Sequence, residues 1–221
     1  PTLGTSDLYN VCSDPLTAVS VPRNSFGYQN ARTGDGYAGI LCKWPTPIRE
    51  YLKVDLGAPL DAGQWYQVSF YVSLANFTCG VEHIGAYFTS TDVYQPTFGV
   101  LNFQPQVEAS QGFLNDTIGW ELITGCFQAA GGEQYMIIGN FRNDAETPID
   151  TDCDGVASYY CVEDISVEIA APPEDIGFDL GGPEFSCSSF EIDPQQPGPI
   201  FHWSDGSDGP TLVVSATGTY V

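Results

Sequence analysis

The chain has 221 residues, with 28 Asp and Glu against 6 Lys and Arg, which gives a formal net charge of −22 at neutral pH. This shortage of bases nearly excludes nucleic acid as a partner, since phosphate binding requires clustered Lys and Arg, and it argues against docking on an anionic membrane. A hydrophobic fraction of 43% is too high for a disordered acidic tail, and no apolar run reaches the ~18 residues of a membrane-spanning helix, so we expect no membrane insertion.

Apolar and polar residues alternate along most of the chain, as in half-buried strands. The clearest case is the segment 64–74, where Tyr66, Val68, Phe70, Val72 and Leu74 share one face. Further strands are predicted near residues 18–21, 36–42, 50–56, 84–88, 98–103, 120–124, 135–139 and 165–169. The residues expected to point inward in these strands are Leu52, Val54 and Leu56; Ile84, Ala86 and Phe88; Trp120, Leu122 and Thr124; Tyr135, Ile137 and Gly139; and Ile165, Val167 and Ile169.

Turn residues separate these segments, and helices have little room in a chain with 24 Gly and 16 Pro. No stretch of 12 residues has a convincing helical period. Eight or more strands separated by turns predict an all-β protein built on a two-sheet β-sandwich of jelly-roll type.

The pattern changes at Ala170–Asp179, where two prolines and an acidic turn are typical of a linker. Residues 172–221 contain eight acids and no Lys or Arg, with short strands expected near 190–192, 200–203, 211–214 and 219–221. We therefore predict a jelly roll over 1–171, a linker over 172–179, and a small, incomplete immunoglobulin-like sandwich over 180–221.

Seven cysteines without a C-x-x-C motif point to disulfides in an oxidising compartment rather than to a zinc site. Six cysteines allow 15 pairings, of which we favour Cys12–Cys42, Cys79–Cys126 and Cys153–Cys161. Only the last pair has local support, because it brackets a loop that leads into a strand. The alternative is that some of these residues are buried, reduced thiols. Cys187 has no assigned partner.

The strongest local motif is D-x-D-x-D-G, formed by Asp150, Asp152, Asp154 and Gly155. Alternating carboxylates of this kind form the first half of an EF-hand-type calcium loop. The twelfth position of such a loop needs a bidentate Glu, and here it is Cys161. The sequence therefore indicates either a calcium site or an acidic, solvated loop.

A sugar site requires exposed aromatic rings beside polar groups, because pyranose faces stack on rings while their hydroxyls form hydrogen bonds. Trp44 is the best candidate, Tyr94 is the next, and Arg49 is positioned in sequence to bind a hydroxyl or carboxylate. The competing interpretation is that Trp44 packs over a sheet edge and Arg49 pairs with a protein carboxylate.

Catalysis has little support in the sequence. His83 is accompanied by no nucleophile motif, and Glu108 and Glu121 form a glycosidase pair only in principle, because acids are abundant throughout the chain. We therefore expect no enzyme activity.

The order of several segments along the chain resembles the galactose-binding-like jelly rolls of large secreted and surface proteins of Bacteroidetes, including gliding-motility-associated proteins. These segments include Val21–Ile40, Gly63–Ala75 and Gly131–Phe141. Phe201–Ser207 and Pro210–Val214 resemble the immunoglobulin-like repeats that follow such jelly rolls. The usual first strand and the end of the repeat do not match, so we expect a fragment of a longer protein.

The resemblance implies a non-catalytic extracellular module of a cell-surface protein that acts in adhesion or scaffolding. The alternatives are a carbohydrate-binding module of a secreted glycoside hydrolase and a filament subunit completed by strand addition. Its implied partners are surface glycans, neighbouring surface domains or further copies of itself. It also implies that Asp164, in the final strand, binds a structural calcium ion; otherwise Asp164 has a turn or ladder role.

Overall fold

The computed structural model describes residues 5–94, 98–109, 112–172, 190–192, 201–203 and 206–214. The chain divides into two compact units, Pro1–Pro172 and Pro173–Val221. Within the described ranges there is no helix, and hence none long and apolar enough to cross a membrane.

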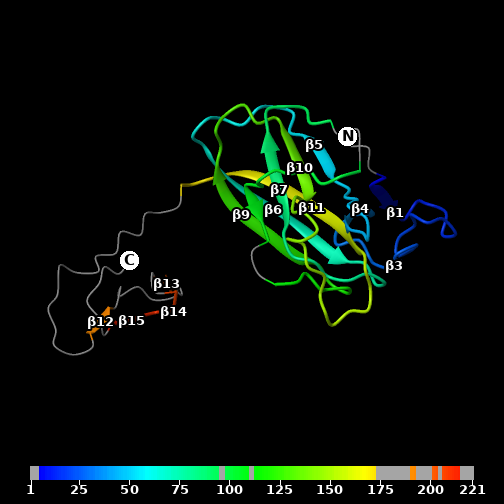
Figure 1. Ribbon diagram of the computed structural model, residues 1–221. Coiled ribbons are helices and arrows are strands. Elements are labelled where there is room, and N and C mark those ends of the chain that lie inside the picture. The colour runs from blue at the N-terminus through cyan, green and yellow to red at the C-terminus, as the bar shows by residue number, and fades with distance from the viewer. Residues whose placement is uncertain are drawn as a thin grey trace. The chain divides into compact units, whose positions relative to one another are not determined.

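The first unit contains two antiparallel sheets packed face to face (Figure 1). The five-stranded sheet has the order β1 (Asp7–Asn10), β4 (Gly36–Lys43), β11 (Ser158–Ala170), β6 (Trp65–Leu74) and β9 (Glu121–Gln128). The four-stranded sheet has the order β5 (Leu52–Asp55), β10 (Tyr135–Asn140), β7 (Ile84–Thr89) and β8 (Val107–Glu108). From β4 to β11 the chain crosses between the sheets after nearly every strand, which is the connectivity of a jelly roll and confirms the predicted all-β class.

The main core lies between the sheets and follows the period of two that the sequence predicts. Val68, Phe70 and Val72 of β6 are fully buried, and they pack with Ile84 and Ala86 of β7. Burying side chains of this size contributes roughly 1.5–3 kcal/mol each relative to leaving them exposed. The alternation in β6 and β7 therefore identified the inward face correctly.

In β9 the predicted inward face is wrong. Ile123 and Phe127 are buried there, whereas Leu122 is 50% exposed. Gly125 sits between them on the inner face, against the side chain of Val107. Trp120 precedes the strand and packs in a different cluster, so it does not belong to the alternation.

The prediction for β11 holds only in part. Its ladder with β6 shifts register between Glu163 and Ser166. Beyond the shift Val167 still packs on the main core, but Ile169 is 72% exposed.

The outer face of the four-stranded sheet carries a third cluster of Tyr51, Leu101, Ile137 and Phe141. Leu101 lies in the segment 98–103, which was predicted to be a strand but forms none. This segment instead covers the sheet, and Phe103 stacks on Tyr87 with ring centroids 4.4 Å apart. Ile137 is therefore buried, but on the face opposite the main core.

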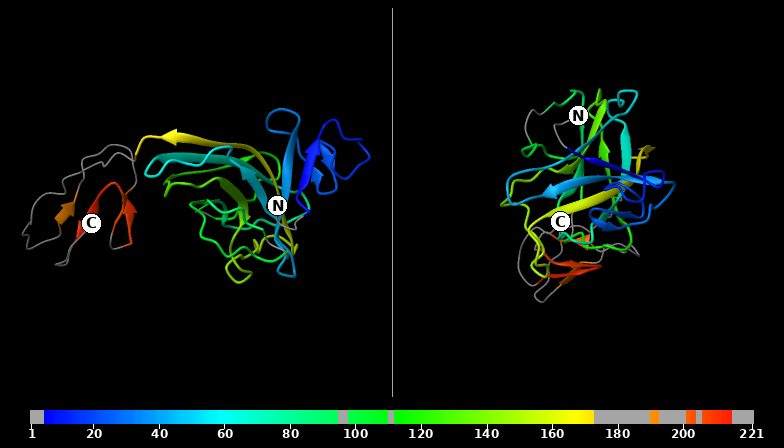
Figure 2. Two further views of the ribbon diagram at one scale, coloured as in Figure 1. Left: turned by 90° about the horizontal axis from the view of Figure 1, so that it is seen from above. Right: turned by 90° about the vertical axis from the view of Figure 1, so that its right-hand side faces the viewer.

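The second cluster lies on the outer face of β1, β4 and β11 and contains Tyr9, Tyr37, Ala75, Tyr159 and Cys161. The segment that covers it includes the hairpin of β2 (Arg23–Asn24) and β3 (Gly27–Tyr28). Within the predicted strand 18–21 only Ser20 forms a β-bridge. Two views place this N-terminal part of the chain beside one side of the sandwich (Figures 1 and 2).

The structure corrects the predicted disulfides, because Cys79 pairs with Cys153. Cys12, Cys42, Cys126 and Cys161 are free thiols, of which Cys42 and Cys161 are buried.

The strand register explains why the other pairings fail. Cys12 comes just after Asn10, the last residue of β1, which pairs with Gly36 of β4. Cys42 lies six residues farther along β4 than Gly36, which is a distance of roughly 20 Å. Cys126 lies beside Gln67 on β6, roughly 20 Å or more from Cys79, which comes after the far end of that strand. Cys161 is held inside the second cluster.

The second unit is described only in short pieces. β12 (Phe190–Ile192) pairs with β15 (Leu212–Val214), and β13 (Phe201–His202) pairs with β14 (Asp208–Gly209), both antiparallel. Trp203 is buried, and its indole Nε1 donates to the Gly209 carbonyl at 3.2 Å. The predicted strand 219–221 and Cys187 lie outside the described residues. The immunoglobulin-like assignment stays a prediction.

Candidate functional site

A cavity of about 380 Å³ opens at the N-terminal side of the first unit, and Trp44 is one of the residues around it. This volume is within the range of about 300–1,000 Å³ that is usual for ligand sites. The lining combines aromatic and aliphatic side chains with two carboxylates. We call this cavity the Trp44 pocket; its lining residues are Thr5, Asp7, Phe26, Leu41, Trp44, Ile48, Glu50, Phe98 and Tyr159.

Of the three residues predicted to bind a sugar, only Trp44 lines this pocket. Its side chain is 44% exposed, as a stacking platform requires. Tyr94 is 65% exposed but is not among the lining residues. Arg49 is 1% exposed and so cannot reach a ligand from its position, which makes the prediction for Arg49 wrong.

Tyr159 forms the rigid base of the pocket. Its ring stacks on Phe26 with centroids 3.8 Å apart, and its hydroxyl donates to Asp7 Oδ2 at 2.7 Å. The Tyr9 hydroxyl lies 2.9 Å from the Tyr159 hydroxyl. The ring packs over Gly39 of β4, where a Cβ atom would lie 2.2 Å from the Tyr159 hydroxyl. A glycine at this position is therefore what allows the ring to lie flat against the strand.

Glu50 forms a second fixed polar wall and is only 6% exposed. One of its carboxylate oxygens accepts from the Thr5 amide at 3.1 Å and from the Thr5 hydroxyl at 2.5 Å. The other accepts from the Leu41 amide at 2.9 Å. These bonds connect the residue Thr5 before β1, strand β4 and the segment after β4. The pocket wall is therefore held in place before any ligand binds.

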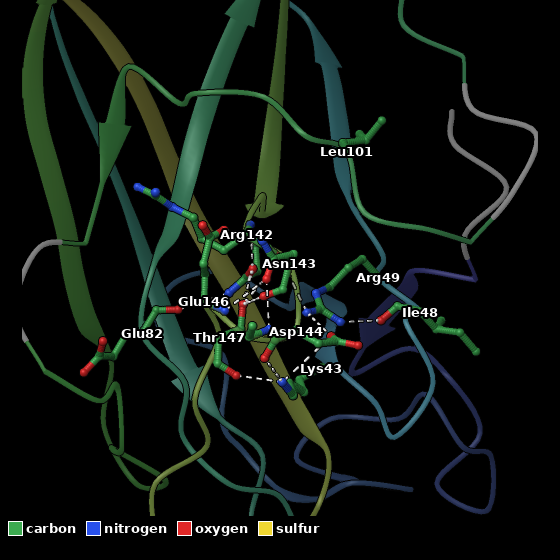
Figure 3. A network of polar contacts seen from close by, with 12 residues as sticks. Lys43, Ile48, Arg49, Glu82, Leu101, Arg142, Asn143, Asp144, Glu146 and Thr147 are labelled. Carbon is green, nitrogen blue, oxygen red and sulfur yellow. Dashed lines mark hydrogen bonds and ion pairs between the residues drawn. The ribbon is translucent and has the colours of Figure 1, made fainter.

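The segment that carries Trp44 and Ile48 is fixed at both ends by a single carboxylate. Arg49 Nη2 donates to Asp144 Oδ1 at 2.7 Å, and Lys43 Nζ lies 3.8 Å from the same oxygen (Figure 3). Lys43 also donates to the main-chain carbonyls of Asp144 and Thr147, and burial lowers its pKa. Arg49 is thus a positioning residue for the pocket, in line with the competing interpretation from the sequence.

Two of the predicted calcium residues, Asp150 and Asp152, take part in hydrogen bonds within the protein. Asp150 accepts from Asn115 Nδ2 at 2.5 Å and from the Asp152 amide at 3.0 Å. These two hydrogen bonds hold the loop in a turn beside the Cys79–Cys153 disulfide. Asp154 is exposed. Across the described ranges, no three His, Cys, Asp or Glu side chains are grouped so as to hold a metal ion.

Asp164 is engaged by other protein groups. It accepts from the Thr33 hydroxyl and pairs with the Arg32 guanidinium, and the pKa of Asp164 is lowered by the Thr33 hydrogen bond and by Arg32. Glu163 accepts from the main-chain amides of Arg32 and Thr33, both at 2.6 Å. These contacts fit the turn or ladder role given as the alternative, and calcium binding by Asp164 stays a prediction.

The acids weighed for catalysis also have protein partners. Glu108 accepts from Arg142 Nε at 3.1 Å and from Nη2 at 2.6 Å, and His83 lies 3.5 Å from Glu108. Glu121 accepts from the Asp116 amide at 2.8 Å. None of these side chains lines the Trp44 pocket.

Sequence reasoning missed most of the pocket. Asp7, Phe26, Glu50 and Tyr159 come from separate parts of the chain and meet only through the order of β1, β4 and β11.

Comparison with known proteins gives similarity only at the level of solved structures. No family model matches the chain, and no curated protein does. The K1 cleaved adhesin domain of Lys-gingipain from Porphyromonas gingivalis W83 is 14% identical over 75% of this chain and 84% of its own, with a TM-score of 0.39.

The K3 cleaved adhesin domain of the same protein is 14% identical over 74% of this chain and 89% of its own, with a TM-score of 0.39. A structure described as "CBM4 structure and function" is 12% identical over 65% of this chain and 89% of its own, with a TM-score of 0.36.

Proposed function

We propose that this chain is a non-catalytic binding module of an extracellular, cell-surface protein, and that it acts in adhesion by binding a glycan in the Trp44 pocket. The observation that carries the proposal is the half-exposed Trp44 ring beside fixed polar groups in a preformed cavity. A pyranose can stack on this ring while its hydroxyls bond to Asp7 and Thr5 at the rim.

Two further observations support this proposal. The pocket is built before binding, since hydrogen bonds of Glu50 and the clamp on Asp144 hold its walls, and preorganisation reduces the entropy cost of binding. The disulfide Cys79–Cys153 supports an extracellular setting, because such bonds persist in oxidising compartments.

A glycan array with purified protein tests the proposal. Glycans that bind the wild type should bind Trp44→Ala at least about tenfold more weakly, since stacking of a sugar on an aromatic ring is worth on the order of 1 kcal/mol or more. Tyr94→Ala and Phe77→Ala are controls, because both rings are exposed and lie outside the pocket. An array without binding, or binding that survives Trp44→Ala, would contradict the proposal.

Self-association is the second candidate function. In the five-stranded sheet, β1 and β9 are the outermost strands, and they expose Leu8 at 73% and Leu122 at 50%. Exposed edge strands with apolar side chains are sites for strand addition by another chain. Sedimentation of the wild type and Leu8→Lys over a range of concentrations tests this, and a concentration-independent monomer would remove it.

A further inference from the structure

We propose that the Trp44 pocket selects glycans that carry free amino groups over neutral and acidic glycans. The inference rests on the proposed function and specifies the chemistry of its ligand. Its basis is the charge of the lining: the nine residues include two carboxylates and no Lys, Arg or His.

The nearest bases along the chain are occupied elsewhere. Lys43 and Arg49 flank the segment that carries Trp44, but their side chains are only 15% and 0% exposed and both pair with Asp144. Among the residues that the structure describes, no Lys, Arg or His at the surface of the pocket therefore cancels its negative charge. A ligand cation would supply the missing positive charge.

Asp7 offers the acceptor for this cation. Its Oδ2 atom accepts from the Tyr159 hydroxyl, while its Oδ1 atom has no hydrogen-bond partner among the residues that the structure describes. Burial raises the pKa of Tyr159 and of Tyr9, which keeps both hydroxyls protonated as donors. The carboxylate is thus fixed on one side and accessible on the other, at the rim of the pocket.

Glu50 adds a buried charge behind the rim. It is stabilised by two main-chain amides and one hydroxyl, and it takes part in none of the ion pairs found in the described ranges. A buried carboxylate without a counter-ion makes the nearby cavity favourable for a cation, because its field is weakly screened there.

The aromatic walls favour the same ligand class. An ammonium group over a Trp, Tyr or Phe ring is attracted by the ring quadrupole, in addition to sugar stacking on Trp44. The net charge of −22 attracts cationic glycans and repels uronic acids over longer distances. A neutral hexose can stack on Trp44 but gains nothing from either carboxylate's charge. An amino sugar uses all of these features together.

Isothermal titration calorimetry at pH 6 with four probes tests the inference: a glucosamine tetramer, its fully N-acetylated form, a tetragalacturonate and tetralysine. The two glucosamine probes have the same rings and linkage and differ in charge. We expect the glucosamine tetramer to bind at least about tenfold more tightly than its N-acetylated form, which corresponds to one ion pair or cation–π contact. Tetragalacturonate should not bind.

Two substitutions connect the selectivity to the pocket. Asp7→Asn keeps the shape and the acceptor for Tyr159, so it should reduce the ratio between the two glucosamine probes to about threefold or less. Asp61→Asn is the matched control: Asp61 is exposed and lies beside the start of β6, which pairs with the end of β11 farthest from Tyr159. It should leave the ratio unchanged. Trp44→Ala should weaken both probes.

The outcomes separate this inference from the proposed function. Equal or tighter binding of the N-acetylated tetramer, or an unchanged ratio in Asp7→Asn, overturns the amino-sugar inference and leaves glycan binding intact. Tetralysine binding as tightly as the glucosamine tetramer also overturns it, since the pocket would then take a basic peptide. No binding of any saccharide, together with an empty glycan array, overturns the proposed function itself.

Discussion

Arg49 and Asp144 form an unequal pair, because the arginine side chain is fully buried and the aspartate side chain is 39% exposed. Arg49 also donates to the Ile48 carbonyl at 3.0 Å, but its Nε atom has no partner in the described part of the chain. The guanidinium therefore depends on Asp144 for its charge balance, whereas Asp144 can be solvated by water.

This inequality predicts different costs for removing the two partners. Asp144→Ala leaves a buried, uncompensated charge and should lower the free energy of unfolding by about 3–5 kcal/mol. Arg49→Met removes the buried charge and fills much of its volume, so the loss should be only about 1–3 kcal/mol. Urea unfolding followed by circular dichroism measures both values.

The double variant Arg49→Met/Asp144→Ala is the control for this prediction. It should be more stable than Asp144→Ala alone, since the stranded charge is gone and the two sites are coupled. Asp154→Ala, at an exposed acid without a described partner, should change stability by less than about 0.5 kcal/mol. Equal losses for both single substitutions would contradict the unequal burial of the pair.

At the scale of elements, local alternation was sufficient to predict strands whose two faces differ in chemistry. β6 has apolar residues on one face and Gln67 and Ser69 on the other, so its register was determined. β9 has apolar residues at both phases, with Leu122 on one face and Ile123 on the other, and its sequence alone could not choose between them. The choice is made by β6, which pairs Ile123 with Phe70.

The candidate site could be predicted far less completely, because it depends on contacts between distant parts of the chain. Trp44 could be proposed from its own loop, but the pocket around it requires Asp7 and Tyr159 to meet across 152 residues. The acidic loop is a different case, because its spacing alone matches a calcium motif. The structure adds that Asp150 accepts from Asn115 and from the turn amide of Asp152, and calcium binding there stays a prediction.

The disulfide is the covalent link between two such distant elements, the turn after β6 and the acidic loop before β11. Cys79 and Cys153 are 74 residues apart, and closing a loop of that length reduces the entropy of the unfolded chain. Cys153→Ser should therefore lower the free energy of unfolding by about 2–4 kcal/mol. Urea unfolding in the absence of reductant measures the loss.

Cys126→Ser is the matched control, because Cys126 is an exposed free thiol in β9 and its loss should change stability by less than about 0.5 kcal/mol. Peptide mapping without reductant should recover a Cys79–Cys153 peptide pair. Recovery of Cys79 linked to Cys126, or of Cys153 linked to Cys161, would show that the observed pairing is wrong.

At the scale of the whole molecule, the first unit buries many weak acids that are neutral at physiological pH. Burial raises the pKa of Cys42 and of Cys161 to about 12. Burial likewise raises the pKa of five tyrosines that lie in the three clusters: Tyr9, Tyr37, Tyr51, Tyr159 and Tyr160. In the unfolded chain these groups ionise near their ordinary pKa values, about 8.5 for Cys and about 10 for Tyr.

The folded state therefore holds more protons than the unfolded state above pH 9, and its stability must fall as the pH rises. Each group adds a slope of about −1.4 kcal/mol per pH unit between its unfolded and folded pKa values, so the loss should begin near pH 9 and steepen above pH 10. Urea unfolding at pH 7, 9, 10 and 11, followed by circular dichroism, measures the slope.

Tyr37→Phe removes one titrating group and should make the slope above pH 10 shallower by about 1.4 kcal/mol per unit. Tyr28→Phe, at a ring that is 53% exposed, controls for the loss of a hydroxyl. A free energy of unfolding that stays constant from pH 9 to 11 would contradict the burial of these side chains.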